Sequence, residues 1–84
     1  MSDERIENDL REYIQKEFMA GKSDVELTND LSLVEAGVLD SLAIFTLIAY
    51  LEERFGVKVE SEDVVIENFD TIDALRELVL QRTG

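Results

Sequence analysis

The chain has 84 residues, of which 45% are apolar, and its 20 acidic and 8 basic residues give a net charge of −12. This length supports one modest hydrophobic core and therefore one domain spanning residues 1–84, while the charge disfavours binding to nucleic acid or an anionic membrane and favours a basic partner surface. Without cysteine or histidine, the chain can form no disulfide, no thiolate metal site and no Ser-His or Cys-His catalytic pair.

The first predicted element is a helix from about Asp3 to Met19, where apolar residues recur at helical spacing. Its opening turn is acidic and Lys16 lies near its end, which suits the helix dipole. Gly21 supplies a C-terminal stop. The acidic N-terminus is unlike a basic signal peptide, and no apolar run reaches the roughly 20 residues of a membrane span, so we expect a cytoplasmic protein.

Residues 22–40 are predicted to form a loop, because polar residues interrupt the helical pattern. Loops longer than roughly 12–15 residues are uncommon in compact domains, so this one needs anchors or a function. We expect it to be ordered and held to the core by four leucines, Leu27, Leu31, Leu33 and Leu39.

Part of this loop resembles the calcium-binding loop of an EF-hand. Its acidic and hydroxyl residues fall at the spacing of that motif, at Asp24, Glu26, Thr28, Asp30, Ser32 and Glu35. Asn29, however, stands where the sharp turn of an EF-hand needs glycine. A solvated acidic loop is therefore the better interpretation, and no metal site is predicted.

The second helix is predicted from Ser41 to Phe55. Asp40 is a suitable N-cap because its carboxylate can accept amides of the first turn, and Gly56 is a suitable left-handed C-cap. Ser41 then lies at the helix start, where free amides and the helix dipole favour an anion attached to its hydroxyl, such as a phosphodiester. A serine beside an N-cap is also common in purely structural helices.

Two apolar groups lie on different faces of this helix. The expected core stripe has Leu47 at its side and consists of Ile44, Ile48, Leu51 and Phe55. Leu42, Phe45 and Ala49 project more than about 90° away from the stripe and are bordered by Thr46 and Glu53. Two interpretations remain open: the helix is buried on all sides, or the second group faces a partner.

The remainder of the chain predicts two shorter helical segments. Residues 57–60 alternate like a strand, but without a second strand they are expected to form an extended connector. A short helical turn containing residues 64–66 is expected to break at residues 68–70, with Phe69 in the core. A last helix, capped by Asp70 or Thr71, runs to about Gln81. The predicted fold is all-α, a small four-helix bundle with a long first loop and a short third helix.

Three runs of the sequence resemble the acyl and peptidyl carrier proteins, which bind phosphopantetheine. These runs are residues 33–42, 51–57 and 68–72, and the resemblance covers nearly the whole chain. Its most specific part is Asp40-Ser41-Leu42 at a loop-to-helix junction. The resemblance implies an acyl-carrier-type bundle of the freestanding kind, consisting of one carrier domain.

The resemblance also implies a modification site and a set of partners. It assigns covalent 4′-phosphopantetheine, transferred from coenzyme A by a phosphopantetheinyl transferase, to Ser41. The transferase and later partners would contact Asp40, Leu42, Phe45, Thr46 and Ala49. The chain would be a monomer without catalytic residues, and the other partners would be a loading ligase and acyl-processing enzymes.

One departure from the family pattern bears on the cargo. Carriers of fatty acid synthesis resemble one another in an acidic face on the second helix, whereas Ala43, Thr46 and Ala49 are neutral here. This favours a carrier of thioester-bound aminoacyl or specialised acyl groups. The alternatives are an acyl carrier protein of fatty acid synthesis, or an unmodified acidic helical adaptor that docks a basic partner.

Overall fold

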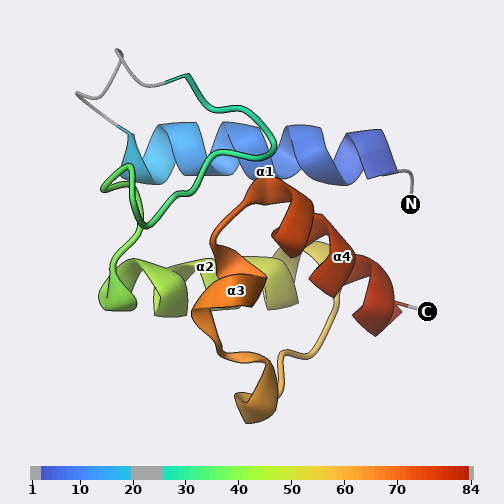
Figure 1. Cartoon of the computed structure of the whole chain (residues 1–84). Coiled ribbons are helices and arrows are strands. Elements are labelled where there is room, and N and C mark those ends of the chain that lie inside the picture. The colour runs from blue at the N-terminus through green and yellow to red at the C-terminus, as the bar shows by residue number, and fades with distance from the viewer. Residues whose placement is uncertain (1–2, 20–25, 84) are drawn as a thin grey trace.

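The computed structural model describes residues 3–19 and 26–83 (Figure 1). Within these residues the α-helices are α1 (Asp3–Phe18), α2 (Ser41–Phe55), α3 (Ile66–Phe69) and α4 (Ile72–Thr83), and a 3-10 turn, η1 (Ser61–Asp63), precedes α3. The described residues contain no strand. Helix α4 packs against the other three helices. The all-α bundle with a long first loop and a short third helix is therefore confirmed.

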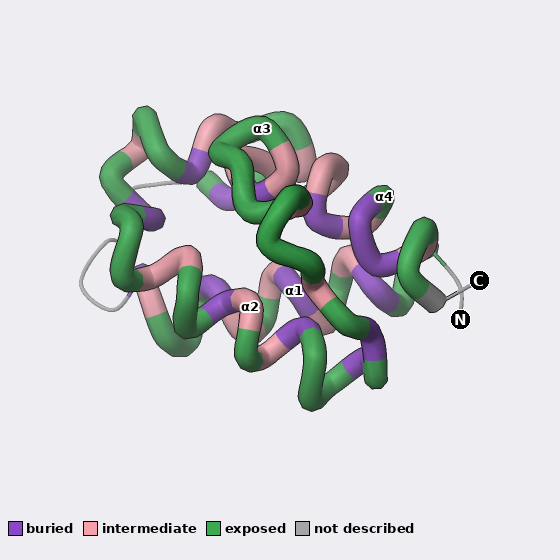
Figure 2. Tube along the Cα trace, turned by 90° about the horizontal axis from the view of Figure 1, so that it is seen from below, coloured by how far each residue is buried: buried purple, intermediate pink, exposed green. Residues whose placement is uncertain are grey.

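One hydrophobic core fills the space between the helices and the loop. Figure 2 shows buried positions alternating with exposed ones along α2, as an amphipathic helix requires. The completely buried side chains come from all four α-helices and the loop: Ile6, Leu10, Ile14, Leu33, Leu47, Leu51, Phe69, Ile72, Leu75 and Val79. Deleting such a side chain typically costs about 2–5 kcal/mol, so these residues provide most of the packing stability.

The buried face of α2 differs from the predicted core stripe. Leu47 and Leu51 are completely buried, whereas Ile44 and Ile48 are partly buried at the edge of the core. Helix α2 packs against α4, and its Tyr50 stacks on Tyr13 of α1 with ring centroids 3.7 Å apart. The face that is buried therefore depends on neighbouring helices and not on periodicity alone.

The predicted break at residues 68–70 was wrong, because Asn68 and Phe69 belong to α3. The side-chain amide of Asn68 donates to the Asp63 carbonyl at 2.8 Å and so stabilises the turn before the helix. Phe69 is completely buried, as predicted. Helix α4 begins after Thr71, whose hydroxyl accepts the Ala74 N–H at 3.0 Å. Thr71 is therefore the cap, and residues 57–60 form the predicted extended connector.

The loop is ordered where it is described. Leu27, Leu33 and Leu39 are buried and Leu31 is partly buried, which confirms their predicted role as anchors. The predicted stop at Gly21 and the calcium-loop position at Asp24 lie outside the described residues. In the described parts of the chain, no helix has the length and apolar character needed to cross a membrane.

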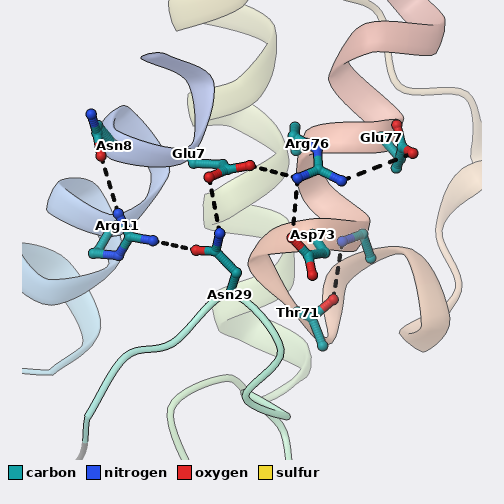
Figure 3. Close-up of polar contacts among 9 residues, drawn as sticks. Glu7, Asn8, Arg11, Asn29, Thr71, Asp73, Arg76 and Glu77 are labelled. Carbon is teal, nitrogen blue, oxygen red and sulfur yellow. Dashed lines mark hydrogen bonds and ion pairs between the residues drawn. The ribbon is translucent and has the colours of Figure 1, made fainter. Parts of the chain in front are cut away.

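A polar network ties the loop to α1 and α4 (Figure 3). Glu7 lies at its centre, where it accepts from Asn29 at 2.9 Å and from Arg76 at 2.5 Å. Arg11 donates to the side-chain oxygen of Asn29, and the Asn29 carbonyl accepts the backbone N–H of Asp73 at 3.1 Å. The hydrogen bond from Arg76 is the main reason that the pKa of Glu7 lies below its ordinary value of 4.5. The charged form of Glu7 therefore stabilises the fold.

The lowered pKa of Glu7 predicts how stability depends on pH. The stabilisation is present above the unfolded-state pKa and is lost as the pH falls through the folded-state pKa. We expect Glu7→Gln to lower the Tm at pH 7 by about 5 °C, and the difference from the unmodified sequence to shrink below about pH 4.5. Thermal unfolding followed by circular dichroism over a pH series measures both effects.

Glu12→Gln is the matched control, because Glu12 is exposed on the same helix and outside this network. It removes the same charge and should leave the Tm nearly unchanged. A Glu7→Gln protein as stable as the control at pH 7 would contradict the role of the network.

Candidate functional site

Ser41 occupies the first position of α2, as the sequence predicts. Asp40 caps the helix in an extended conformation (φ −120°, ψ −175°), and its carboxylate accepts the Ala43 N–H at 2.8 Å. The helix ends as predicted at Gly56, whose φ of 68° is left-handed. Both Asp40 and Ser41 are exposed. The Ser41 hydroxyl forms no hydrogen bond with any described residue, and the exposure of Ser41 makes it accessible for chemistry.

The local electrostatics at Ser41 suit an anion. The helix that starts there has 15 residues and no acidic residue in its first turn. The backbone amides of Ser41 and Leu42 have no acceptor among the described residues, and they lie at the positive end of the helix dipole. A phosphodiester on the Ser41 hydroxyl would meet these amides, and the site therefore fits a phosphopantetheine group.

A compact turn positions the start of α2. The Leu33 carbonyl accepts the N–H groups of Val38 and Leu39, at 2.9 and 3.2 Å. Gly37 makes this turn possible, because its φ of 75° is a left-handed conformation that disfavours other residues. Val38 and Leu39 are buried, so the chain directly before Asp40 is fixed to the core.

Asp70, at the junction of α3 and α4, holds this turn in place. Its carboxylate accepts from the Ser32 hydroxyl at 2.8 and 2.9 Å and from the Val34 N–H at 3.1 Å. Its backbone carbonyl accepts the Leu33 N–H at 2.6 Å. Asp70 therefore joins the loop to the junction of α3 and α4, which is a role that its predicted function as a helix cap did not include.

The second apolar group of α2 is exposed, so the interpretation of a helix buried on all sides is wrong. Leu42 is 75% exposed and Phe45 is 63% exposed. Thr46 and Ala49 are also exposed. We call these four residues the α2 patch. They lie on the same helix as Ser41, within about two turns of it.

Sequence reasoning missed a second exposed apolar segment. Val64, Val65 and Ile66, between η1 and the start of α3, are 36%, 46% and 58% exposed. The available signal was a run of three apolar residues without helical periodicity.

The two hydroxyl residues of the calcium-like motif are used in hydrogen bonds within the chain. Thr28 donates to Asp30 at 2.8 Å, and Ser32 donates to Asp70. Among residues 3–19 and 26–83, no group of three or more acidic side chains is arranged to hold a metal ion.

Comparisons with known proteins agree with this geometry. Residues 8–79 match the family model described as "Phosphopantetheine attachment site". A D-alanyl carrier protein of Lacticaseibacillus casei (strain BL23) is 32% identical over 71 residues, 84% of this chain and 85% of the relative. The probable acyl carrier protein PigG of Serratia sp. (strain ATCC 39006) is 30% identical over 74 residues, 88% of this chain and 84% of the relative.

A solved structure is similar to the chain as well. It is titled "Crystal structure of FAD-dependent dehydrogenase", and the matched chain is 30% identical with a TM-score of 0.73. The alignment covers 83% of this chain and 97% of that chain, so nearly all of the matched chain has a counterpart here.

The position of Asp70 predicts that it controls order at the start of α2. Asp70→Ala leaves the Ser32 hydroxyl and the Val34 amide without their acceptor and should destabilise the fold by about 1–3 kcal/mol. Amide hydrogen exchange at Val38 and Leu39 should become faster. Urea unfolding and exchange measured by NMR test these two expectations.

Asp30→Ala is the control in the same loop, because Asp30 is exposed and, among the described residues, its side chain accepts a hydrogen bond only from Thr28. It should change stability by no more than about 0.5 kcal/mol. Unchanged exchange at Val38 and Leu39 in Asp70→Ala would show that the loop holds its shape without the Asp70 contacts.

Proposed function

The chain belongs to the family of carrier proteins with a phosphopantetheine attachment site, and we propose that Ser41 is the residue that carries its covalent 4′-phosphopantetheine. The observation that carries this proposal is the exposed Ser41 hydroxyl at the start of α2, beside amides that have no acceptor among the described residues. The family match over residues 8–79 supports one carrier domain in the chain.

The prosthetic group supplies a terminal thiol, which holds cargo as a thioester. The residues of the chain position the arm. Asp40 fixes the helix start, and the unpaired amides at the N-terminal end of α2 stabilise the negative phosphodiester. The chain has no histidine to activate the Ser41 hydroxyl. We therefore propose that the transferase supplies the base and the Mg²⁺ for attachment, and that the carrier has no catalytic activity of its own.

For the cargo, we propose an aminoacyl group that an ATP-dependent ligase loads onto the arm. Two observations support this choice. The curated relatives include a D-alanyl carrier protein at 32% identity, and α2 carries no charge from Ser41 through Leu51. A ligase that docks on this face would meet the apolar α2 patch, and basic residues around its docking site would suit the net charge of −12.

A second candidate is a specialised acyl group that is oxidised while it is bound to the carrier. It is favoured by the relative named as a probable acyl carrier protein and by the similar chain in a structure titled for an FAD-dependent dehydrogenase. A flavin enzyme that introduces one double bond would remove two hydrogen atoms from the loaded arm. Mass spectrometry of the loaded carrier distinguishes this change from aminoacylation.

Attachment is tested by incubating the protein with coenzyme A, Mg²⁺ and a broad-specificity phosphopantetheinyl transferase. The intact mass should rise by one phosphopantetheine. Ser41→Ala should abolish the increase while leaving the helical circular dichroism spectrum unchanged, because the Ser41 side chain is exposed and forms no hydrogen bond with any described residue. Modification of the Ser41→Ala protein, or no modification of the unaltered sequence, would overturn the assignment.

The α2 patch is tested by separating stability from recognition. Phe45→Glu exchanges an exposed ring for a solvated charge and should change stability by no more than about 0.5 kcal/mol. Its loading by the cognate ligase should fall about tenfold or more, as expected for a binding hot spot. The measurements are urea unfolding and the rate of aminoacylation of the phosphopantetheinylated protein.

Leu47→Ala provides the contrasting variant on the same helix. Leu47 is completely buried, so its truncation should cost about 2–5 kcal/mol. If Phe45→Glu destabilises the protein as much as Leu47→Ala, or is loaded at the normal rate, Phe45 has no specific role in recognition.

A further inference from the structure

A groove between α1 and α2 borders the α2 patch and shares Thr46 and Ala49 with it. Its volume is about 460 Å³, within the usual range of small-molecule sites. Tyr13 contributes from α1, and α2 contributes the remaining lining residues, Thr46, Ala49, Tyr50, Glu53 and Arg54. We call it the tyrosine groove.

The aromatic wall of the groove is preorganised. The rings of Tyr13 and Tyr50 are stacked at 3.7 Å with an interplanar angle of 12°. Phe18 packs edge-on against Tyr13, and Phe55 packs edge-on against Tyr50. The Tyr50 hydroxyl donates to the Asp9 carbonyl at 3.2 Å, which fixes the ring further. A ligand that enters the groove would therefore meet a rigid surface.

The two charged residues of the groove differ in their pairing. Arg54 is bound to the Asp9 carboxylate at 3.0 Å. Glu53 is exposed and forms no hydrogen bond or ion pair with any described residue. The groove therefore combines an apolar aromatic wall with one carboxylate that is free to bind a cation, and the ammonium group of an amino acid has the matching charge.

The groove lies within reach of an arm on Ser41. Leu42, Thr46, Ala49 and Glu53 follow one another at helical spacing, so they form a continuous line along one side of α2. With a rise of 1.5 Å per residue, Ala49 is about 12 Å and Glu53 about 18 Å along the helix from Ser41. An extended phosphopantetheine spans about 16 Å if it reaches as far per bond as an extended peptide. The aminoacyl group lengthens the arm, and the Glu53 side chain tilts back toward the helix N-terminus, so the two can meet.

We propose that the tyrosine groove binds the aminoacyl end of the loaded arm, with the cargo against Tyr50 and its ammonium group at Glu53. This inference rests on the proposed function, since it requires both the arm on Ser41 and an aminoacyl cargo. Docking would place the thioester against the protein and reduce its exposure to water. The loaded carrier would then lose less cargo by hydrolysis between its loading enzyme and the next enzyme.

The chain provides its own probe for this groove. It has two tyrosines and no tryptophan, and both tyrosines line the groove. Near-ultraviolet circular dichroism around the tyrosine band, and the NMR signals of the two rings, therefore report on the groove directly. The broad-specificity transferase can attach arms from coenzyme A, D-alanyl-coenzyme A or propionyl-coenzyme A, which gives the free thiol, the aminoacyl form and a form without the amine.

The D-alanyl form should shift the ring signals of Tyr13 and Tyr50, whereas the thiol and propionyl forms should leave them unchanged. Glu53→Gln should abolish the shift and make hydrolysis of the D-alanyl thioester about two- to fivefold faster, without loss of attachment or of the Tm. Glu67→Gln removes the same charge from an exposed position on α3 and should behave as the unaltered protein.

The possible outcomes distinguish failure of the carrier function from failure of the groove proposal. If no arm is attached to Ser41, the proposed function fails, and the groove proposal fails with it. If the D-alanyl form is made and both tyrosines are unaffected, or the signals of the opposite side of α2 shift instead, the groove proposal is overturned while the carrier function stands. An equal response to the propionyl form overturns the assignment of the ammonium group to Glu53.

Discussion

The carboxylate of Asp70 is the contact on which the geometry of the site depends. It accepts hydrogen bonds from the Ser32 hydroxyl and the Val34 amide, and the backbone carbonyl of Asp70 accepts one from the Leu33 amide. These bonds fix the long loop to the junction of α3 and α4. The turn that follows buries Val38 and Leu39. A long loop with few contacts would leave Ser41 mobile, whereas this one presents the serine from a fixed point.

Charge is distributed unevenly over the molecule. Charged residues stabilise the contacts between α1, the loop and α4, whereas the helix that carries Ser41 is largely uncharged. The polar network around Glu7 and Arg76 joins α1, the loop and α4 (Figure 3). Helix α2, by contrast, carries no charge from Ser41 through Leu51 although the whole chain carries −12. Its exposed apolar residues contribute little to folding, because they remain in contact with solvent. Exposed apolar groups with a polar surround are typical of binding surfaces, which supports the role proposed for the α2 patch.

Local signals predicted the start and end of α2, because the Asp40 cap and the left-handed Gly56 are decided by their immediate neighbours. The cap of α4, the buried face of α2 and the tyrosine groove depend instead on contacts between segments that are distant in the sequence. Asp70 and Thr71 were equal candidates to cap α4, and only the loop partner of Asp70 distinguishes them. The burial of Leu47 and the tyrosine groove both depend on how α2 is rotated against α1. No pattern within one helix contains that information, because the end of α1, the whole loop and the first part of α2 separate the two tyrosines in the sequence.

The central claim is that Ser41 carries the arm on a helix start that is already ordered before modification. Amide chemical shifts of the apo and phosphopantetheinylated protein, compared by NMR under identical conditions, test it most directly. The account predicts that changes are confined to Ser41 and the amides of the first turn of α2, including Leu42 and Ala43, with Val38, Leu39 and the residues around Asp70 unchanged. Changes that extend through the loop to Asp70, or that centre on another residue, would contradict it.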